Sequence, residues 1–189
     1  GWSGSQFVQP YYFGYANKNS YWGLNFNYVS SKNTTPGHEG KINTFTDTLL
    51  YFSTRNNKDK YIVDYNLGIN IPTGKAKLSS YERNARMDED LVRFAEFGEG
   101  WNFTPGIAVT RRIGGDKDLL TLGTNYSFRG SYDPTSDIDD DKFNPGNEWQ
   151  KYLRWQHAEE KWQLVGELLH TSSAESKIAD GSVFDTGAV

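Results

Sequence analysis

Polar side chains recur at every second position along several segments of this chain, and they include carboxylates, guanidinium groups and amides. Alternate residues of a β-strand lie on one face of a sheet, so we expect these groups to share a face. Such a mixture is typical of the lining of a polar passage, where it tunes selectivity. The predicted lining residues are Asp64, Asn66, Asn70, Asn102, Arg112, Asn125, Arg129, Arg154 and Glu167.

The charges on this face allow two interpretations. Arg112, Arg129 and Arg154 form a ladder that favours anions in the first interpretation. In the second, Asp64 and Glu167 neutralise the arginines, and pairing among such groups can also seal a lumen. We favour a narrow open pore, but the sequence does not exclude a lumen sealed by paired groups.

A second set of residues has the types needed for nucleophilic catalysis. His170 and Ser172 are two positions apart on one strand-like segment and therefore share a face. Outer-membrane lipases and deacylases place a His-x-Ser pair at the membrane-facing outer end of a strand, with a third polar group that orients the base. A lipid hydrolase that uses His170 and Ser172, with Glu175 or another residue as the third group, is therefore the alternative function.

An acidic segment resembles a calcium-binding loop in its spacing. Lys142 occupies the position where such a loop requires glycine, so a true EF-hand is excluded. A looser divalent-cation site that bridges lipopolysaccharide phosphates is a weak alternative to a solvated acidic loop. The candidate ligands are Asp137, Asp139, Asp141 and Glu148.

Eight strand-like runs would position these side chains. They alternate polar with apolar residues, as in the outward set Trp22, Leu24, Phe26 and Tyr28. Most contain ten to twelve residues, close to the ~9–11 that cross a bilayer at a tilt. The runs are Gln6–Ala16, Tyr21–Ser30, Asn43–Thr54, Lys60–Ile71, Trp101–Arg112, Leu119–Tyr132, Asn147–His157 and Lys161–Thr171.

Short and long connections alternate between these runs without exception. The long ones are residues 31–42, 72–100, 133–146 and 172–181. Barrels of the outer membrane have short periplasmic turns and long extracellular loops. We therefore predict an all-β fold, a transmembrane antiparallel up-and-down β-barrel. Within the longest loop, the apolar spacing over residues 81–97 predicts a short amphipathic helix that folds inward or covers the barrel mouth.

The direction of the runs predicts that residues 1–189 are one incomplete barrel domain. The first run starts on the long-loop side, and a ninth strand is expected at Ser182–Val189. Both visible ends then lie outside the cell, whereas barrel termini face the periplasm. We therefore expect further strands on both sides, for about twelve in all.

Composition limits the function classes. Aromatic residues reach 15%, which suits a wall with one apolar face, and no apolar run is long enough for a membrane-spanning helix. The net charge of −4 argues against nucleic acid as a partner. Cysteine is absent, so a disulfide framework and a thiolate metal site are excluded, and we expect no cofactor. A soluble all-β sugar-binding module also fits this composition.

Four stretches resemble the bacterial outer-membrane proteins of the phenol degradation meta-pathway family, often described as transporters. They are LGINIPTG (67–74), EGWNFTPGIAV (99–109), LTLGTNYSF (120–128) and WQLVGELL (162–169). The resemblance covers roughly residues 60–170, and its motifs are of moderate specificity. It implies a transmembrane barrel for uptake of small, hydrophobic or aromatic compounds, and it transfers no catalytic residues.

Together these features predict a channel or transporter in the bacterial outer membrane, not an enzyme. Its expected partners are outer-membrane lipid, lipopolysaccharide and a small permeant. Besides the hydrolase and the soluble module, a structural barrel that sheathes another polypeptide stays open. The sequence does not decide the permeant or the oligomeric state.

Overall fold

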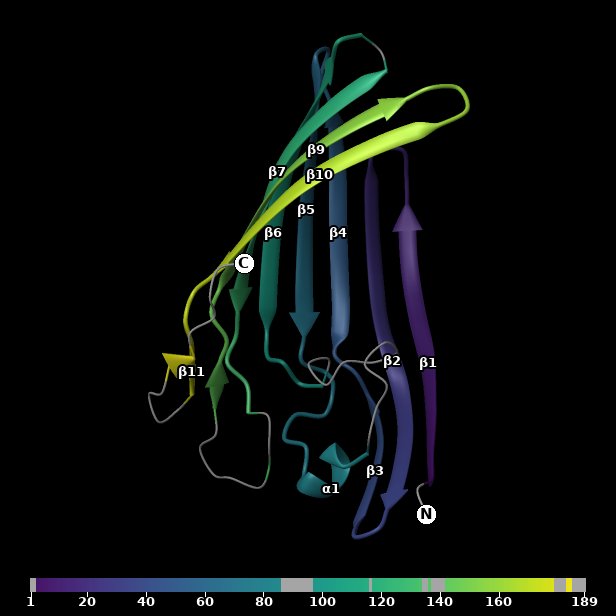
Figure 1. Cartoon of the computed structure of the whole chain (residues 1–189), viewed down its shortest axis with the longest axis vertical. Coiled ribbons are helices and arrows are strands. Elements are labelled where there is room, and N and C mark those ends of the chain that lie inside the picture. The colour runs from purple at the N-terminus through teal and green to yellow at the C-terminus, as the bar shows by residue number, and fades with distance from the viewer. Residues whose placement is uncertain are drawn as a thin grey trace.

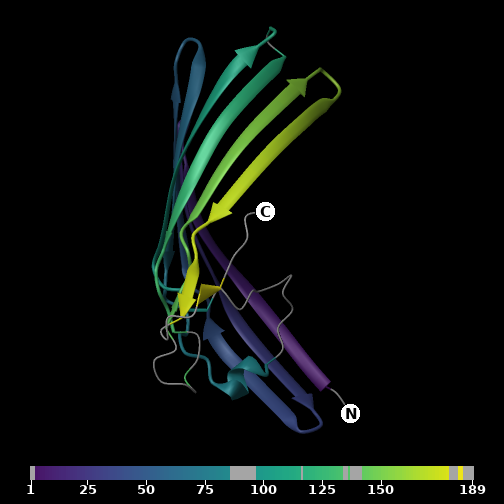
Figure 2. The same ribbon diagram turned by 60° about the vertical axis from the view of Figure 1, so that its left-hand side comes forward.

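Nine strands of the chain join in one antiparallel sheet that curves strongly across its width (Figure 1, Figure 2). The computed structural model describes residues 3–85, 97–115, 117–133, 136, 142–178 and 183–184. The prediction of an all-β, antiparallel fold is confirmed. Among the described residues, no helix is long and apolar enough to cross a membrane.

The main sheet has the strand order β1-β2-β4-β5-β6-β7-β9-β10, and β3 pairs with the distal part of β2. Three short strands form a second sheet in the order β12-β11-β8. The bounds are β1 Ser3–Ala16, β2 Ser20–Thr35, β3 His38–Phe45, β4 Thr48–Asn57, β5 Tyr61–Ile71, β6 Asn102–Ile113, β7 Asp118–Arg129, β8 Phe143–Asn144, β9 Glu148–Ala158, β10 Gln163–Ser173, β11 Ser176–Ile178 and β12 Val183–Phe184, with one helix, α1, at Ser80–Arg83.

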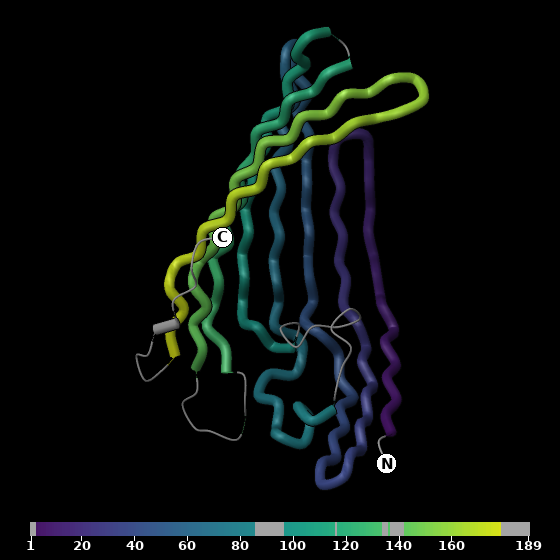
Figure 3. The backbone as a smooth tube through the Cα atoms, viewed as in Figure 1, coloured from purple at the N-terminus to yellow at the C-terminus, as the bar shows by residue number. Residues whose placement is uncertain are grey.

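The connections divide between the two ends of the sheet, as the sequence predicts. Figure 3 shows the tight turns β1–β2, β4–β5, β6–β7 and β9–β10 together at its top, and the longer connections at its bottom. We call these the tight-turn end and the long-loop end. The eight strands β1, β2, β4, β5, β6, β7, β9 and β10 therefore run between these two ends.

The cross-strand register separates an apolar face from a polar one. Trp22 stands opposite Phe52, and Leu122 stands opposite Leu153. These apolar side chains are not covered, since Leu122 is 64% and Leu168 is 71% exposed. The first face is thus apolar and open, and we call it the convex face.

The opposite, concave face carries most of the glycines within the long strands. A curved sheet leaves less room on its inner side, so small residues there relieve crowding. At Gly123, an added Cβ atom would lie 2.2 Å from Cζ of Tyr152, whose ring covers the glycine. The glycines on this face of the long strands include Gly14, Gly23, Gly68, Gly106 and Gly123.

The predicted strand Asn43–Thr54 is wrong, because two strands, β3 and β4, occupy this part of the chain. Phe45 pairs with Tyr28 and Leu49 pairs with Asn25, so one extra residue stands between these pairs on the β3–β4 side. This extra residue makes a β-bulge, and it moves Phe45 and Leu49 to opposite faces.

The predicted loop 31–42 is also wrong. β2 runs to Thr35 and β3 starts at His38, so most of this segment is a long hairpin that extends beyond the main sheet. Its turn contains Pro36 and Gly37, and Gly37 has a φ of 87° that glycine adopts readily.

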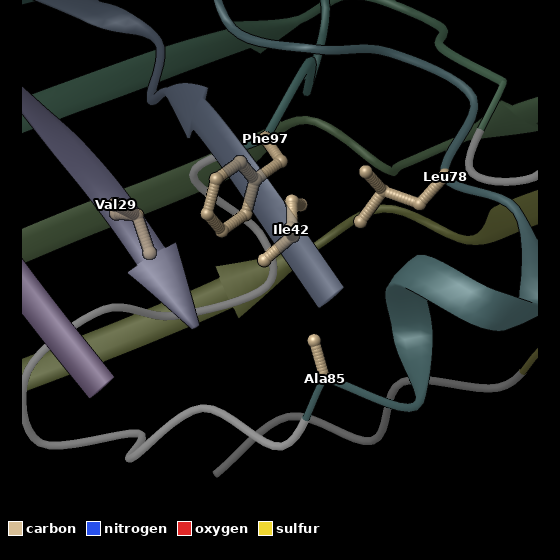
Figure 4. Close-up of a cluster of buried hydrophobic side chains, with 5 residues drawn as sticks. All are labelled: Val29, Ile42, Leu78, Ala85 and Phe97. Carbon is tan, nitrogen blue, oxygen red and sulfur yellow. The ribbon is translucent and has the colours of Figure 1, made fainter. Parts of the chain in front are cut away.

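Part of the connection between β5 and β6 packs against this hairpin on the concave side. Leu78, Ala85 and Phe97 of the connection bury Val29 of β2 and Ile42 of β3 (Figure 4). All five side chains are at most 5% exposed, and Val8 packs beside them. The described part of loop 72–100 therefore lies on the concave side of the hairpin, a position that fits both folding inward and covering the barrel mouth.

The helix in this connection is short and well capped. Ser79 and Glu82 form a capping box at the start of α1. Burial opposes ionisation of Glu82, but hydrogen bonds from Lys75 and Ser79 outweigh it and lower the pKa of Glu82. The helix predicted within residues 81–97 is therefore present only as one turn in the described part, and residues 86–96 lie outside the described residues.

Short strands occupy parts of the other two predicted long loops. β8 lies within residues 133–146, while the end of β10 and β11 lie within residues 172–181. Of the strand expected at Ser182–Val189, the structure describes Val183–Phe184, which pairs with β11 and not with the main sheet.

The outer strands of the main sheet are β1 and β10. Within the described residues they pair with β2 and β9 respectively and not with each other, so the sheet is open. β1 runs toward the tight-turn end, whereas β10 runs away from it (Figure 1).

Truncating Phe97 tests the packing of the loop on the hairpin. Phe97→Ala should destabilise that packing by about 3–5 kcal/mol, because it removes a large buried side chain. We expect faster trypsin cleavage at Lys75 and Lys77, with β-sheet circular dichroism unchanged. The control is Tyr81→Ala, which truncates an exposed ring of α1. Equal cleavage rates for wild type and Phe97→Ala would contradict the packing.

Candidate functional site

The concave face gathers all nine residues that the sequence predicts as lining. The register places Asn70 opposite Asn102, Asn102 opposite Arg129, and Arg154 opposite Glu167. The remaining members, Asp64, Asn66, Arg112 and Asn125, occupy the same face of β5, β6 and β7. Thus five adjacent strands contribute to a single polar surface.

An ion pair that the sequence analysis missed lies on this surface. Arg55 of β4 donates from Nε to Oδ1 of Asp64 at 2.7 Å and from Nη2 to Oδ2 at 3.1 Å. Two parallel hydrogen bonds of this kind fix the geometry of both side chains. Arg55 could have been found by aligning β4 against β5, because the register sets it directly opposite Asp64.

Two further arginines of this surface also have acidic neighbours. Arg129 lies 3.8 Å from Glu99, measured from Nη2 to Oε1, and Arg154 stands across from Glu167. The concave face therefore carries acidic groups beside three of its arginines. This arrangement favours the neutralised interpretation over a ladder of unpaired arginines.

Neutral hydrogen bonds connect the strands between these charges. Nδ2 of Asn66 donates to Oδ1 of Asn125 at 3.2 Å, across Gly106 of the intervening strand. Replacing Gly106 by any residue with a side chain would break this contact, because the added Cβ atom would clash with Oδ1 of Asn125. Thr110 and Thr121 are hydrogen-bonded at 2.8 Å on the same face.

Two hollows open onto the concave surface. One of about 490 Å³ is lined by residues that include Arg55, Asp64, Asn66, Thr121, Tyr152 and Arg154. The other, of about 710 Å³, lies nearer the long-loop end, and its lining includes Asp47, Asn70, Asn102, Thr104 and Arg129. Both are large enough for water and for small organic solutes.

A buried carboxylate, Asp47, forms one wall of the second hollow. It sits at the bulge between β3 and β4 and is only 3% exposed. Its Oδ1 accepts hydrogen bonds from the backbone N–H groups of Gly74 at 2.9 Å and Gly98 at 3.0 Å. Its Oδ2 accepts from Nδ2 of Asn70 at 2.8 Å and from the backbone N–H of Glu99 at 2.9 Å.

These four hydrogen bonds join three separate segments at the long-loop end. They connect the start of β4 to the end of β5 and to both ends of the long connection. Nδ2 of Asn70 also donates to the carbonyl of Gly100 at 2.9 Å. Gly98 has a φ of 72°, a conformation that suits glycine and turns its N–H toward the carboxylate. Asp47 thus anchors the loop.

Strict alternation along the predicted strand Asn43–Thr54 puts Asp47 on one face with Phe45, Leu49 and Tyr51, and it does not predict this role. The only available signal was a carboxylate between apolar residues of that face. Such a residue indicates either a passage-lining group or a local irregularity, and the alternation of side chains does not distinguish the two.

The candidate hydrolase pair is not assembled. His170 and Ser172 lie on the convex face of β10, as predicted, opposite Lys151 and Trp149 respectively. Oγ of Ser172 donates to the carbonyl of Trp149 at 3.5 Å. Within the described residues, no hydrogen bond joins His170 to Ser172 or to Glu175, so the relay that activates a serine is missing.

The acidic candidate for a cation site falls largely outside the described residues. Asp137, Asp139 and Asp141 are not among them. Glu148 lies on the concave face, where Oε1 accepts a hydrogen bond from Nε2 of Gln150 at 2.7 Å. In the described ranges, no group of three His, Asp or Glu residues is arranged to hold a metal ion.

Comparisons with known proteins give no match, either to a protein-family model or to a curated protein sequence. The resemblance to the phenol degradation meta-pathway family therefore stays a prediction.

Replacing the Asp47 carboxylate tests the anchor. Asp47→Asn keeps the side-chain size but turns an N–H₂ group toward two of the four donors. We therefore expect the packing of the connection against the sheet to lose at least about 2 kcal/mol of stability. Trypsin should cleave the connection at Lys75 and Lys77 faster than in wild type. Asp59→Asn, in the exposed turn after β4, is the matched control. Unchanged protection in Asp47→Asn would show that the carboxylate does not anchor the loop.

Proposed function

We propose that this chain is the wall of a bacterial outer-membrane β-barrel that lets small solutes pass through a polar lumen. The observation that carries the proposal is the uncovered apolar convex face opposite a hydrogen-bonded polar face. A water-soluble sheet buries its apolar face, whereas a barrel in a bilayer presents it to lipid. The permeant class, small hydrophobic or aromatic compounds, comes only from the family resemblance.

The position of aromatic rings on the convex face supports membrane insertion. Trp22, Tyr61 and Trp162 are exposed near the tight-turn end, and Trp101 and Trp149 are exposed near the long-loop end. Tryptophan and tyrosine concentrate at both membrane–water interfaces, where their polar atoms meet water. On β9 and β10, Leu153 and Leu168 lie between the two groups of rings, whereas Phe52 and Tyr65 lie between them on β4 and β5. Exposed rings near both ends of the sheet support two membrane interfaces.

Closure of the sheet into a barrel is compatible with its open edges. β1 and β10 run in opposite directions, so they can pair with each other directly or through an even number of added antiparallel strands. Bacterial single-chain barrels have even numbers of strands. We propose that the lumen is closed in this way, with about twelve strands in total.

The concave face supports passage of water and small polar groups. Its paired charges lower the barrier for neutral solutes, since no single sign of charge dominates the two hollows. The loop anchored by Asp47 narrows the long-loop end and reduces the size of solute that can enter. The proposed location is the bacterial outer membrane, with tight turns in the periplasm.

Single-channel recording tests this function. The complete barrel, refolded in detergent and added to a planar lipid bilayer, should produce stepwise currents. A barrel-fold control is the shift in gel mobility between unheated and heated samples. A folded, inserted protein that carries no current would contradict an open lumen, and failure to insert into bilayers would contradict the membrane location.

The Arg55–Asp64 pair provides a sharper prediction. Arg55→Gln leaves Asp64 unpaired, so the lumen gains negative charge and the reversal potential in a KCl gradient should shift toward cation selectivity. The double variant Arg55→Gln/Asp64→Asn should restore the wild-type value. If Arg55→Gln and wild type share one reversal potential, Arg55 does not face the permeating ions.

A further inference from the structure

Two basic side chains lie together on the convex face, where apolar residues dominate. Lys151 of β9 stands opposite His170 of β10, and both side chains are exposed. The next pair of this face toward the tight-turn end is Leu153 with Leu168. The basic pair therefore borders the aliphatic belt and lies about three residues, roughly 10 Å along the strand, from the long-loop end.

The charge of Lys151 is not balanced by a neighbouring carboxylate. Among the described residues, neither Lys151 nor His170 forms an ion pair or a hydrogen bond to a carboxylate. Glu148 and Glu167 belong to the same two strands but lie on the concave face. An ammonium group at a lipid-facing position is costly without a counter-charge, and such a residue is by default a candidate functional group.

Trp149 holds the ammonium group near the long-loop end. Nζ of Lys151 lies 3.6 Å from the centroid of the Trp149 ring, and this ring is two residues closer to the long-loop end. Nε1 of Trp149 donates to Oγ1 of Thr124 at 2.6 Å, which fixes the ring. The lysine side chain therefore directs its charge along the wall toward the interface, as long basic side chains do in membranes.

We propose that Lys151 and His170 bind the phosphate group of the outer-leaflet glycolipid, with Trp149 against the sugar and acyl chains. This inference rests on the proposed function, because it requires the convex face to meet the outer leaflet. An ammonium group and an imidazole N–H are suitable donors to a phosphate oxygen.

The test compares lipid A with its phosphate-free form and with a different anionic lipid. Detergent-solubilised wild-type protein is incubated with lipid A, with lipid A from which the phosphates have been removed, or with phosphatidylglycerol. Native mass spectrometry measures the bound fraction. Wild type should retain lipid A at least roughly fivefold better than the phosphate-free lipid and better than phosphatidylglycerol. Equal retention of lipid A and the phosphate-free lipid would overturn the proposal, and preference for phosphatidylglycerol would overturn the choice of glycolipid.

Variants assign this retention to the two residues. Lys151→Gln/His170→Gln should lower lipid A retention roughly fivefold or more, and Lys151→Arg should keep it. Lys18→Gln, in the tight turn at the opposite end, is the control and should match wild type. Unchanged retention in the double variant would contradict the assignment. Single-channel currents of the double variant should stay at the wild-type level, so loss of this lipid site and loss of channel function are separate outcomes.

Discussion

Because side chains on a β-strand alternate between two faces, each long strand of this sheet has to meet two environments at once. The convex environment accepts Leu122 and Leu168 uncovered, and the concave one accepts a network of amides, hydroxyls and paired charges. Curvature then limits volume on the concave side, which is why glycines such as Gly106 and Gly123 lie there. The polar surface, its hollows and the apolar wall all follow from this one alternation.

The bulge between β3 and β4 interrupts this alternation and has a structural role. The bulge at Thr46 and Asp47 interrupts the regular pairing with β2 and places the Asp47 carboxylate in a buried position between β3 and β4. The carboxylate collects donors from β5 and from both ends of the following connection. The connection can therefore turn inward and cover Val29 and Ile42, which would otherwise be apolar residues on a polar face.

Much of the fold could be predicted because period-two patterns are local. The tight turns, the direction of each strand and the nine concave residues need only the sequence of each run. The bulge could not be predicted, since one extra residue is visible only when β3 and β4 are aligned with β2. The Arg55–Asp64 pair and the Asp47 anchor depend on contacts between strands and loops, so their residue types alone did not identify them.

In a membrane-embedded wall, the convex face must meet lipid and the concave face must meet water. The chain has no cysteine, so a single label can be attached at Glu167→Cys or at the adjacent Leu168→Cys. Spin labels at these sites in lipid vesicles report contact with oxygen, which concentrates in lipid, or with a water-soluble nickel complex. We predict oxygen contact at residue 168 and nickel contact at residue 167. Equal nickel contact at both sites would contradict a membrane-embedded wall.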